Sequence, residues 1–216
     1  MDCARLAILA ICALLSTTIE PFGGAPQASD SSSRDFADLA VSSTIEPASE
    51  TIDQAVANQI LGRLSMRHTA LSERERIALV QTILREARAH DLDPGLVVAV
   101  IEVESAGYHL AVSQVGAMGL MQILPATGKE LADRMNIEWR GPDTLFDPVI
   151  NVKLGTAYLR QLADRYGNVH TALAAYNWGP GRIDRRLRRG ATVPSRYIEQ
   201  VMRVVDRNAL AAVSRS

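Results

Sequence analysis

The stretch from residue 93 to residue 107 constrains the fold of this chain most strongly. Asp93 followed by Pro94 predicts a helix start, since an aspartate can cap the first free amides and proline is favoured at the first helical position. Residues 96–101 (LVVAVI) are all apolar, so the helix that contains them is buried on nearly every side. Gly107 can end this helix as its C′ residue. Such a helix needs a shell of other elements around it.

The surrounding sequence predicts that this shell is also helical. Ser72 and Glu75 have the spacing of a capping box, and the apolar residues of 77–87 recur at helical intervals. No segment shows a strong strand pattern. Further helices are predicted over about 125–134, 148–166 and 172–176, then in a turn opened by Pro180 and in a last helix from about 194. We therefore expect an all-α domain over 72–214, with a small irregular hairpin in its Gly-rich stretch near 115–123.

The N-terminal segment has the pattern of an export signal. Arg5 precedes an apolar run over residues 6–15, which is shorter than the roughly 20 residues that span a bilayer but typical of a signal peptide. An uncleaved anchor or a simple N-terminal helix is the alternative. Both cysteines, Cys3 and Cys12, lie in this segment, so a cleaved protein would hold neither a disulfide nor a thiol nucleophile. We predict a signal peptide over 1–25.

Residues 26–71 connect this segment to the predicted domain. Up to about residue 50 they are rich in Ser, Asp, Ala and Pro and follow neither helical nor strand periodicity, which is typical of a flexible linker. The segment 52–65 carries apolar side chains on one helical face, at Ile52, Val56, Ile60 and Leu64. The expectation is a flexible linker over 26–71 that contains one short amphipathic helix.

The overall charge and the lack of several motifs exclude common functions. Lysine plus arginine number 23 and aspartate plus glutamate number 24, so the net charge of −1 gives no electrostatic basis for nucleic-acid binding. The four histidines are scattered without the spacing of a metal site, and the sequence has neither a nucleophile elbow nor a phosphate-binding loop. We expect no metal, no cofactor and no nucleic-acid partner.

A carboxylate at the end of the buried helix is the strongest candidate for chemistry. Glu104 lies seven residues after Val97 and three after Ile101, so it shares their helical face. Partial burial raises the pKa of a carboxyl, as a general acid at neutral pH requires. A glutamate that simply reaches solvent is the plainer alternative. Glu102 is a rival that projects about 200° away round the helix, so both cannot face one cleft. Periodicity does not choose between them.

Four ordered motif blocks resemble one known family. Residues 99–107 (AVIEVESAG) resemble the Glu-Ser motif of the lytic transglycosylases that have a soluble-lytic-transglycosylase, goose-lysozyme-like domain. Residues 116–122 (GAMGLMQ) are similar to the family's Gly-Leu-Met-Gln segment, and residues 174–181 (AAYNWGPG) to its Ala-Tyr-Asn-x-Gly-Pro-Gly segment. The remaining block is residues 151–159 (NVKLGTAYL). The order and spacing of the four blocks make the resemblance specific.

The resemblance implies a lysozyme-like, all-helical fold in which Glu104 is the single catalytic acid/base. By position it also implies six residues that support or line the sugar site, namely Ser105, Met121, Gln122, Tyr176, Asn177 and Tyr197. The chain departs from the family at 194–197, where the glutamate-threonine pair that often precedes the tyrosine is missing. A second carboxylate is therefore not expected at that position.

The implied activity is that of a peptidoglycan lytic transglycosylase. Such an enzyme cleaves the β-1,4 bond between N-acetylmuramic acid and N-acetylglucosamine and leaves a 1,6-anhydro-muramyl product. The implied partner is the peptidoglycan glycan strand, and the implied location is periplasmic or extracytoplasmic. Two alternatives stay open: a hydrolytic muramidase of the same fold, which would use Asp143 or Asp147 to position water, and a non-catalytic glycan-binding protein. The sequence also leaves open an association with a membrane or a secretion apparatus.

Overall fold

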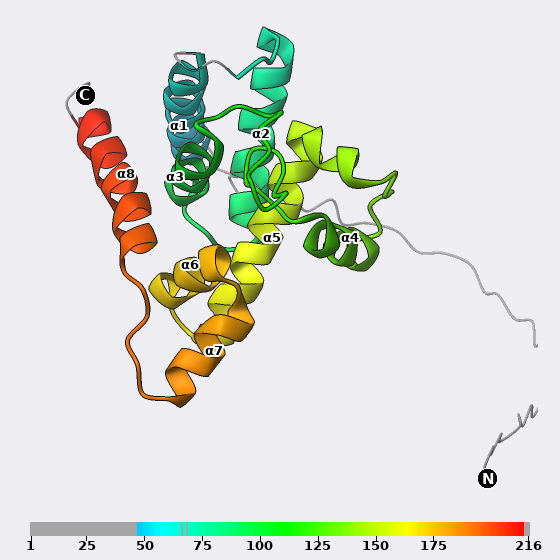
Figure 1. Cartoon of the computed structure of the whole chain (residues 1–216). Helices are drawn as coiled ribbons and strands as arrows, with labels where there is room; N and C mark the ends of the chain where they lie inside the picture. The colour runs from blue at the N-terminus through cyan, green and yellow to red at the C-terminus, as the bar shows by residue number, and fades with distance from the viewer. Residues whose placement is uncertain (1–46, 66, 68, 214–216) are drawn as a thin grey trace, which may run out of the picture. The chain divides into compact units, whose positions relative to one another are not determined.

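The computed structural model describes residues 47–65, 67 and 69–213, and Figure 1 shows them as a set of packed helices. The chain divides into two units, residues 1–42 and 43–216, and the described residues all belong to the second. In chain order the helices are α1 (Pro47–Ser65), α2 (Glu73–Ala89), α3 (Pro94–Ser105), α4 (Pro125–Arg134), the 3-10 helix η1 (Pro142–Phe146), α5 (Pro148–Tyr166), α6 (Val169–Trp178), α7 (Pro180–Arg188) and α8 (Arg196–Val213). The predicted all-α class is confirmed for the described part of the chain. The predicted signal peptide lies outside it.

Helix α3 is the buried centre that the sequence predicts. The carboxylate of Asp93 accepts hydrogen bonds from the amides of Gly95 and Leu96, at 2.5 and 3.2 Å, and so caps the helix. Residues 96–101 are all buried. Helices α2 and α8 pack against α3 and supply part of the apolar shell that this run of residues requires (Figure 1). Among the described helices, none has both the length and the apolar character needed to cross a membrane.

The end of α3 confirms the prediction, since Gly107 is the C′ residue that follows the C-cap Ala106. The helix ends at Ser105, and Ala106 rather than Gly107 is the first residue in the left-handed conformation, with φ of 52°. Gly107 follows with φ of 87°, a value that favours glycine. Two successive residues with positive φ turn the chain sharply into the loop that connects α3 to α4. The side chain of Ser105 then reaches across this loop to the carbonyl of Leu120, at 2.8 Å.

Helix α5 organises the loop between α3 and α4 through one buried amide. Asn151 has 0% exposure, and its Oδ1 accepts a hydrogen bond from the backbone amide of Met121 at 2.7 Å. The Nδ2 of Asn151 donates to the carbonyl of Met118 at 3.0 Å. Isolated antiparallel bridges pair Met118 with Val112 and with Ile123. The predicted irregular hairpin is therefore present, and a side chain of α5 holds it in place.

Helix α1 belongs to the folded unit and corrects the predicted domain boundary. Its residues Ile60 and Leu64 are each 4% exposed and lie in the same apolar core as α2 and α3. The side-chain amide of Gln59 donates to the carbonyl of Asn208 in α8 at 3.0 Å. The predicted flexible linker over 26–71 therefore does not extend to its end, because the apolar face of its short helix finds partners in the core. The earlier part of that linker lies outside the described residues.

The remaining helices match their predicted positions with small shifts. Helices α4 and α5 have the predicted bounds. Helix α6 is longer than the predicted 172–176, because the side chain of Asn168 caps it through the amide of Thr171 at 2.7 Å. Pro180 opens α7 as a full helix, and α8 begins at Arg196, slightly later than predicted.

Candidate active site

Glu104 lies in the last turn of α3, and its carboxyl is only partly exposed. Its Oε1 accepts a hydrogen bond of 2.6 Å from the hydroxyl of Tyr197, which α8 brings to the end of α3. Burial raises the pKa of the Glu104 carboxyl, and the Tyr197 hydroxyl offsets part of this rise because it stabilises the ionised form. A carboxyl in this environment holds its proton to a higher pH than an exposed glutamate, which suits a general acid.

Two phenols lie near Glu104, the buried Tyr197 and the partly exposed Tyr176. Tyr197 is 6% exposed, and Tyr176 from α6 donates a hydrogen bond of 2.7 Å to the carbonyl of Met121. Burial, and then the charge of Glu104, raise the pKa of both phenols well above the usual range. Both hydroxyls therefore keep their protons at neutral pH, and that of Tyr197 donates to Glu104 while that of Tyr176 donates to Met121.

A cavity of about 190 Å³ lies beside Tyr176. Its walls come from the end of the loop between α3 and α4, from the first turn of α4, from α5 and from the junction of α6 and α7: Gln122, Ile123, Leu124, Thr127, Tyr158, Tyr176, Asn177, Trp178 and Gly179. Tyr176 links the cavity to Glu104. It borders the cavity, and the negative charge of Glu104 helps to raise the pKa of its hydroxyl. Aromatic rings and amides side by side offer a sugar both apolar faces and hydrogen-bonding groups.

The amide of Gln122 has a fixed orientation at the cavity wall. Its Nε2 donates to the carbonyls of Ala111 and Gly119, at 3.0 and 2.9 Å. Both amide hydrogens are thereby used, so Oε1 is the atom left to accept a hydrogen bond from a ligand. Asn177, which is exposed in the last turn of α6, borders the same cavity. The structure therefore brings together Gln122, Tyr176 and Asn177, as the motif blocks predict.

Ser105 and Met121 take positions other than direct contact with a sugar. The Ser105 hydroxyl bonds the carbonyls of Ile101 and Leu120, at 3.1 and 2.8 Å, and accepts from the amide of Gly107. These bonds hold the end of α3, where Glu104 lies, against the loop between α3 and α4. Met121 has 0% exposure, which corrects the expectation that its side chain lines the cleft. Only its backbone takes part in the site, as the acceptor for Tyr176.

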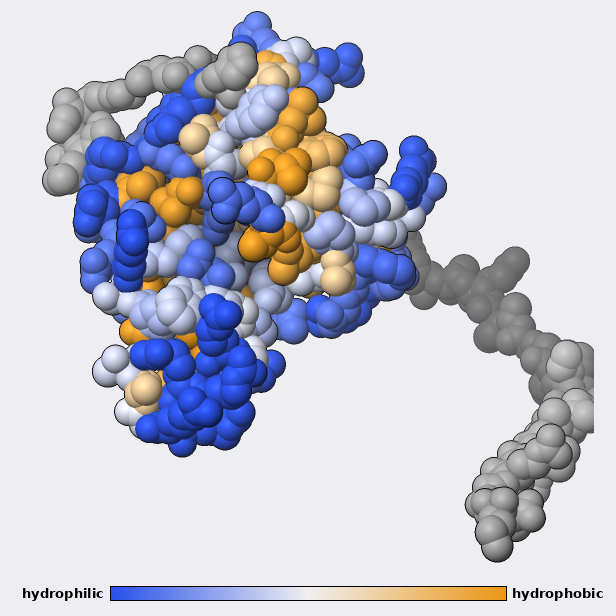
Figure 2. All heavy atoms as spheres, in the orientation of Figure 1, coloured by the Kyte–Doolittle hydropathy of each residue, from blue (hydrophilic) through white to orange (hydrophobic). Residues whose placement is uncertain are grey.

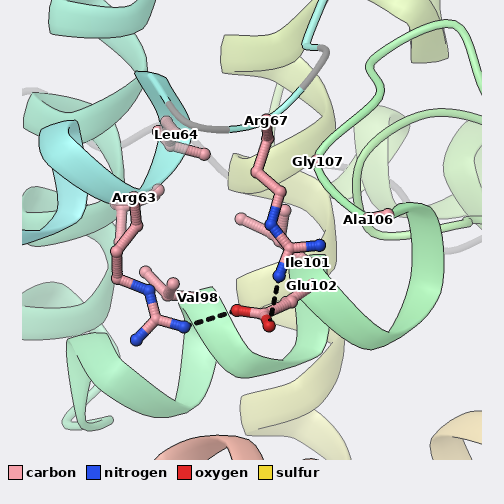
Figure 3. Close-up of a pocket in the computed structure, with 9 residues that line it drawn as sticks. Arg63, Leu64, Arg67, Val98, Ile101, Glu102, Ala106 and Gly107 are labelled. Carbon is pink, nitrogen blue, oxygen red and sulfur yellow. Dashed lines mark hydrogen bonds and ion pairs between the residues drawn. The ribbon is translucent and has the colours of Figure 1, made fainter. Parts of the chain in front are cut away.

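Glu102, the rival carboxylate, serves another purpose. Its Oε2 accepts from Arg63 of α1, and its Oε1 accepts from Arg67 and from Arg207 of α8, each at 2.5 Å. Figure 3 shows Arg63 and Arg67 directed at Glu102 from the side of α1. Both carboxylate oxygens are thus occupied by guanidinium groups. Glu102 joins α1, α3 and α8, whereas Glu104 is the carboxyl whose charge acts on Tyr176, a residue of the cavity wall.

Sequence reasoning missed two contributors to the site. Tyr158 lies in the motif block 151–159 and was given no role in the sugar site, but it lines the cavity and packs on Tyr176, with ring centroids 5.4 Å apart. Asn151 lies in a recognised motif block, yet nothing in the sequence shows that its amide holds the loop. In the described part of the chain, no group of three or more His, Cys, Asp or Glu side chains is arranged to hold a metal ion.

Comparison with known proteins assigns this arrangement to a family. The model of the transglycosylase SLT domain matches residues 81–198, which is more than half of the chain. The chain belongs to the SLT domain family. Its match begins inside α2 and ends inside α8, so α1 and most of α8 lie outside the matched region.

Individual SLT-domain relatives agree with this assignment. The chain is 41% identical over 116 residues to the transglycosylase of Enterobacteria phage PRD1, covering 48% of this chain and 40% of that protein. It is 37% identical over 133 residues to the soluble lytic murein transglycosylase of Salmonella typhimurium, covering 61% of this chain and 20% of that protein. The SLT-like region therefore spans less than half the length of these relatives.

A solved structure of the same family resembles the fold. The inactive mutant of the lytic transglycosylase Slt from Pseudomonas aeruginosa matches with a TM-score of 0.54 and 29% sequence identity, covering 61% of this chain and 24% of that one. The likeness confirms the predicted lysozyme-like, helical arrangement of the SLT domain.

Proposed function

We propose that this chain is a peptidoglycan lytic transglycosylase, which cleaves the β-1,4 bond between N-acetylmuramic acid and N-acetylglucosamine and forms a 1,6-anhydro-muramyl end. The observation that carries the proposal is the half-buried carboxyl of Glu104, which is held by Tyr197 and whose charge acts on Tyr176, a residue of the cavity wall. The relatives support it, since each is named a transglycosylase. The Pseudomonas protein was solved as an inactive mutant in which one glutamate is replaced by glutamine, and this agrees with a reaction that depends on one carboxyl.

In the first step, Glu104 acts as a general acid. Tyr197 donates to Oε1, so the proton of the neutral carboxyl sits on Oε2 and is free to move to the glycosidic oxygen. The bond between that oxygen and the anomeric carbon breaks. The carbonyl oxygen of the muramyl acetamido group stabilises the positive charge that develops at the anomeric carbon. Glu104 is left ionised, and the hydrogen bond from Tyr197 stabilises this form.

In the second step, the same carboxylate acts as a general base. Glu104 removes the proton from the 6-hydroxyl of the muramyl sugar, and the oxygen attacks the anomeric carbon of its own ring. The 1,6-anhydro bond forms, no water is consumed, and Glu104 regains the proton that it gave away. An intramolecular nucleophile needs no second carboxylate to activate water and benefits from a high effective concentration.

The substrate places the proposed enzyme outside the cytoplasm, where peptidoglycan lies. The predicted signal peptide over 1–25 and the names of the murein-degrading relatives support this location. Peptidoglycan glycan strands are the proposed partner, and Gln122 and Asn177 are the proposed polar contacts to the sugars.

The product decides between this proposal and a hydrolytic muramidase. Digestion of purified sacculi followed by mass spectrometry should yield anhydro-muramyl ends, while a hydrolase would yield reducing ends. The structure gives the hydrolase little support: Asp147 caps α5 through the amides of Val149 and Ile150, at 2.8 and 2.9 Å, and Asp143 lies in η1.

One substitution tests the catalytic role of the site. Glu104→Gln keeps the shape of the side chain and its acceptor for Tyr197 but cannot transfer a proton, so it should abolish product formation. Glu73→Gln, at an exposed position in α2, is the matched control and should retain full activity. Undiminished product release by the folded Glu104→Gln variant would refute the proposal and leave a different catalytic group to be found.

A further inference from the structure

The segment formed by α7 and its end is strongly basic, although the whole chain carries a net charge of only −1. Residues 180–190 contain five arginines: Arg182, Arg185, Arg186, Arg188 and Arg189. The single acid among them, Asp184, is already bonded to Arg165 at 2.5 Å and to the hydroxyl of Tyr166 at 2.8 Å. Asp184 therefore does not neutralise the arginines of its own helix.

These five arginines, which we call the arginine face, share one side of α7. At 100° per residue they occupy an arc of about 160°. Ile183, which has 0% exposure, anchors the opposite side of the helix in the core. Figure 2 shows an almost uniformly hydrophilic surface at the lower end of the view, where Figure 1 places α7.

Three members of the arginine face have no partner among the described residues. Arg185, Arg188 and Arg189 are exposed and form neither an ion pair nor a side-chain hydrogen bond there. The other two contact their surroundings, since Arg182 stacks on Trp178 and Nε of Arg186 donates to a backbone carbonyl. Like charges three and four residues apart destabilise a helix. An anionic ligand would therefore reduce the repulsion between these arginines, which no acidic side chain of the described residues neutralises.

The arginine face continues directly from the cavity wall. Trp178 and Gly179 border the cavity, and Pro180, the next residue, begins α7. The guanidinium carbon of Arg182 lies 5.2 Å from the centre of the Trp178 ring, so charge begins at the edge of the cavity. The arginine face is thus the charged surface next to the cavity wall.

We propose that the arginine face binds the carboxylates of the stem peptides that branch from the glycan strand in the cavity. This inference rests on the proposed function. Stem peptides carry free carboxylates, and a guanidinium group pairs with a carboxylate through two parallel hydrogen bonds. Recognition of peptide branches would direct the enzyme to strands that still carry them.

The composition of α7 favours this ligand over an anionic membrane. A helix that lies in a membrane interface needs an apolar face to insert between the lipids. Helix α7 has only Leu187 as a large exposed apolar side chain, and Ile183 is fully buried. The helix thus offers charge without an apolar surface of the size that insertion requires.

The test compares two variants that each remove two arginines. Arg185→Gln/Arg189→Gln alters the arginine face. Arg74→Gln/Arg203→Gln removes two exposed arginines from α2 and α8 and is the matched control. Both are made in the Glu104→Gln background, so that binding is measured without digestion. The ligand is purified sacculi with acetylated amines, whose carboxylates are either left free or converted to methylamides.

The arginine-face variant should bind the carboxylate-bearing sacculi about three- to tenfold more weakly than its parent, as expected for the loss of two exposed charge pairs. The control variant should bind like the parent. On methylamide sacculi the parent, the arginine-face variant and the control variant should all bind with the same affinity. That affinity should equal the weakened affinity of the arginine-face variant for the carboxylate-bearing sacculi. The difference on free carboxylates should also shrink as salt is added, because exposed charges are screened.

Equal binding of the arginine-face variant and its parent to the carboxylate-bearing sacculi would overturn the inference. The inference would also be overturned, in favour of a membrane ligand, if the arginine-face variant bound sacculi like its parent but bound vesicles of anionic phosphatidylglycerol more weakly. Failure of the proposed function is seen separately, by digestion with the protein that retains Glu104. Anhydro products from methylamide sacculi keep the proposed function whatever the binding result, whereas no products from either substrate refute the proposed function.

Discussion

The hydroxyl of Tyr197 lies 2.6 Å from Oε1 of Glu104 and joins α8 to the last turn of α3. Burial raises the pKa of the carboxyl, and this hydrogen bond limits the rise because it stabilises the ionised form. The two effects act in opposite directions on one proton. A group that must give a proton and then take one back needs such a balance, since a pKa far from the working pH would favour only one of the two steps.

Removal of the Tyr197 hydroxyl should show this balance. We expect Tyr197→Phe to lower kcat about ten- to a hundredfold, the range for losing one hydrogen bond to a charged group. The pKa of Glu104 should rise further, because the ionised form loses its donor. The alkaline limb of the pH dependence of kcat should therefore move to higher pH, which activity measurements from acid to alkaline pH would record.

The matched control for this measurement is Tyr166→Phe. The Tyr166 hydroxyl donates to the carbonyl of Pro180 and to the carboxylate of Asp184, at 3.1 and 2.8 Å, and not to Glu104. Its loss should leave the alkaline limb in place. If Tyr197→Phe lowered kcat at every pH without moving either limb of the pH dependence, Tyr197 would not set the pKa of Glu104.

The stability of the fold should depend on the charge of Glu104. Its folded pKa is raised, so the folded state gains from the proton at low pH, and this gain is lost as the pH rises through the folded pKa. Glu104→Gln is never ionised. We therefore expect equal melting temperatures of the two proteins below about pH 4, where the carboxyl is protonated in both the folded and the unfolded state.

Above the folded pKa, Glu104→Gln should melt at a higher temperature than the unaltered protein, because the latter must keep a charge in a partly buried site. Thermal unfolding followed by circular dichroism across this pH range measures the difference. A glutamine variant that is less stable at alkaline pH would show that the carboxylate is solvated or paired, contrary to the burial seen here.

Short sequence patterns predicted those parts of the fold that are determined by residues close together in the sequence. The cap at Asp93 and the apolar run after it were enough to place α3 and to bury it. The amphipathic pattern before residue 66 predicted a helix, but a pattern of this kind does not say which surface covers it. The packing of α1 on the core therefore came only from the structure.

The candidate site was predictable only in part. Periodicity left Glu102 and Glu104 equal, and the choice between them needed the family resemblance. The structure explains the choice through Arg63 and Arg207, which are distant in sequence and occupy Glu102. The burial of Met121 was not predictable, because a motif position does not fix the direction of a side chain. Its thioether packs where Gly155 leaves room for it on α5.

The cluster around Glu102 should contribute to stability rather than to chemistry. Glu102→Gln removes the charge that three guanidinium groups share, so the free energy of unfolding should fall by about 1–3 kcal/mol, between the values for exposed and for buried pairs. Urea unfolding measures the change. Glu138→Gln, which breaks one exposed pair with Arg140, is the control and should have little effect.

The site itself should keep its chemistry in this variant. Both carboxylate oxygens of Glu102 are bound by arginines, so folded Glu102→Gln should retain the pH dependence of the unaltered protein even where its melting temperature falls. If Glu102→Gln shifted the pH dependence of activity and left the free energy of unfolding unchanged, Glu102 would take part in catalysis. That result would contradict its role as an anchor for α1 and α8.

Two glycines of the loop between α3 and α4 offer a matched test of how tightly Asn151 holds it. Gly116 and Gly119 both have φ of 79°, so alanine at either position bears the same backbone strain, about 1–2 kcal/mol. A Cβ at Gly116 would meet open space, whereas a Cβ at Gly119 would collide with the Asn151 amide and the carbonyl of Leu145. Gly119→Ala should therefore cost at least about 2 kcal/mol more than Gly116→Ala and lower activity, because Gln122 and the acceptor for Tyr176 belong to the same loop. Urea unfolding and sacculus digestion measure both effects, and equal losses in the two variants would show that the contacts of Asn151 do not position the site.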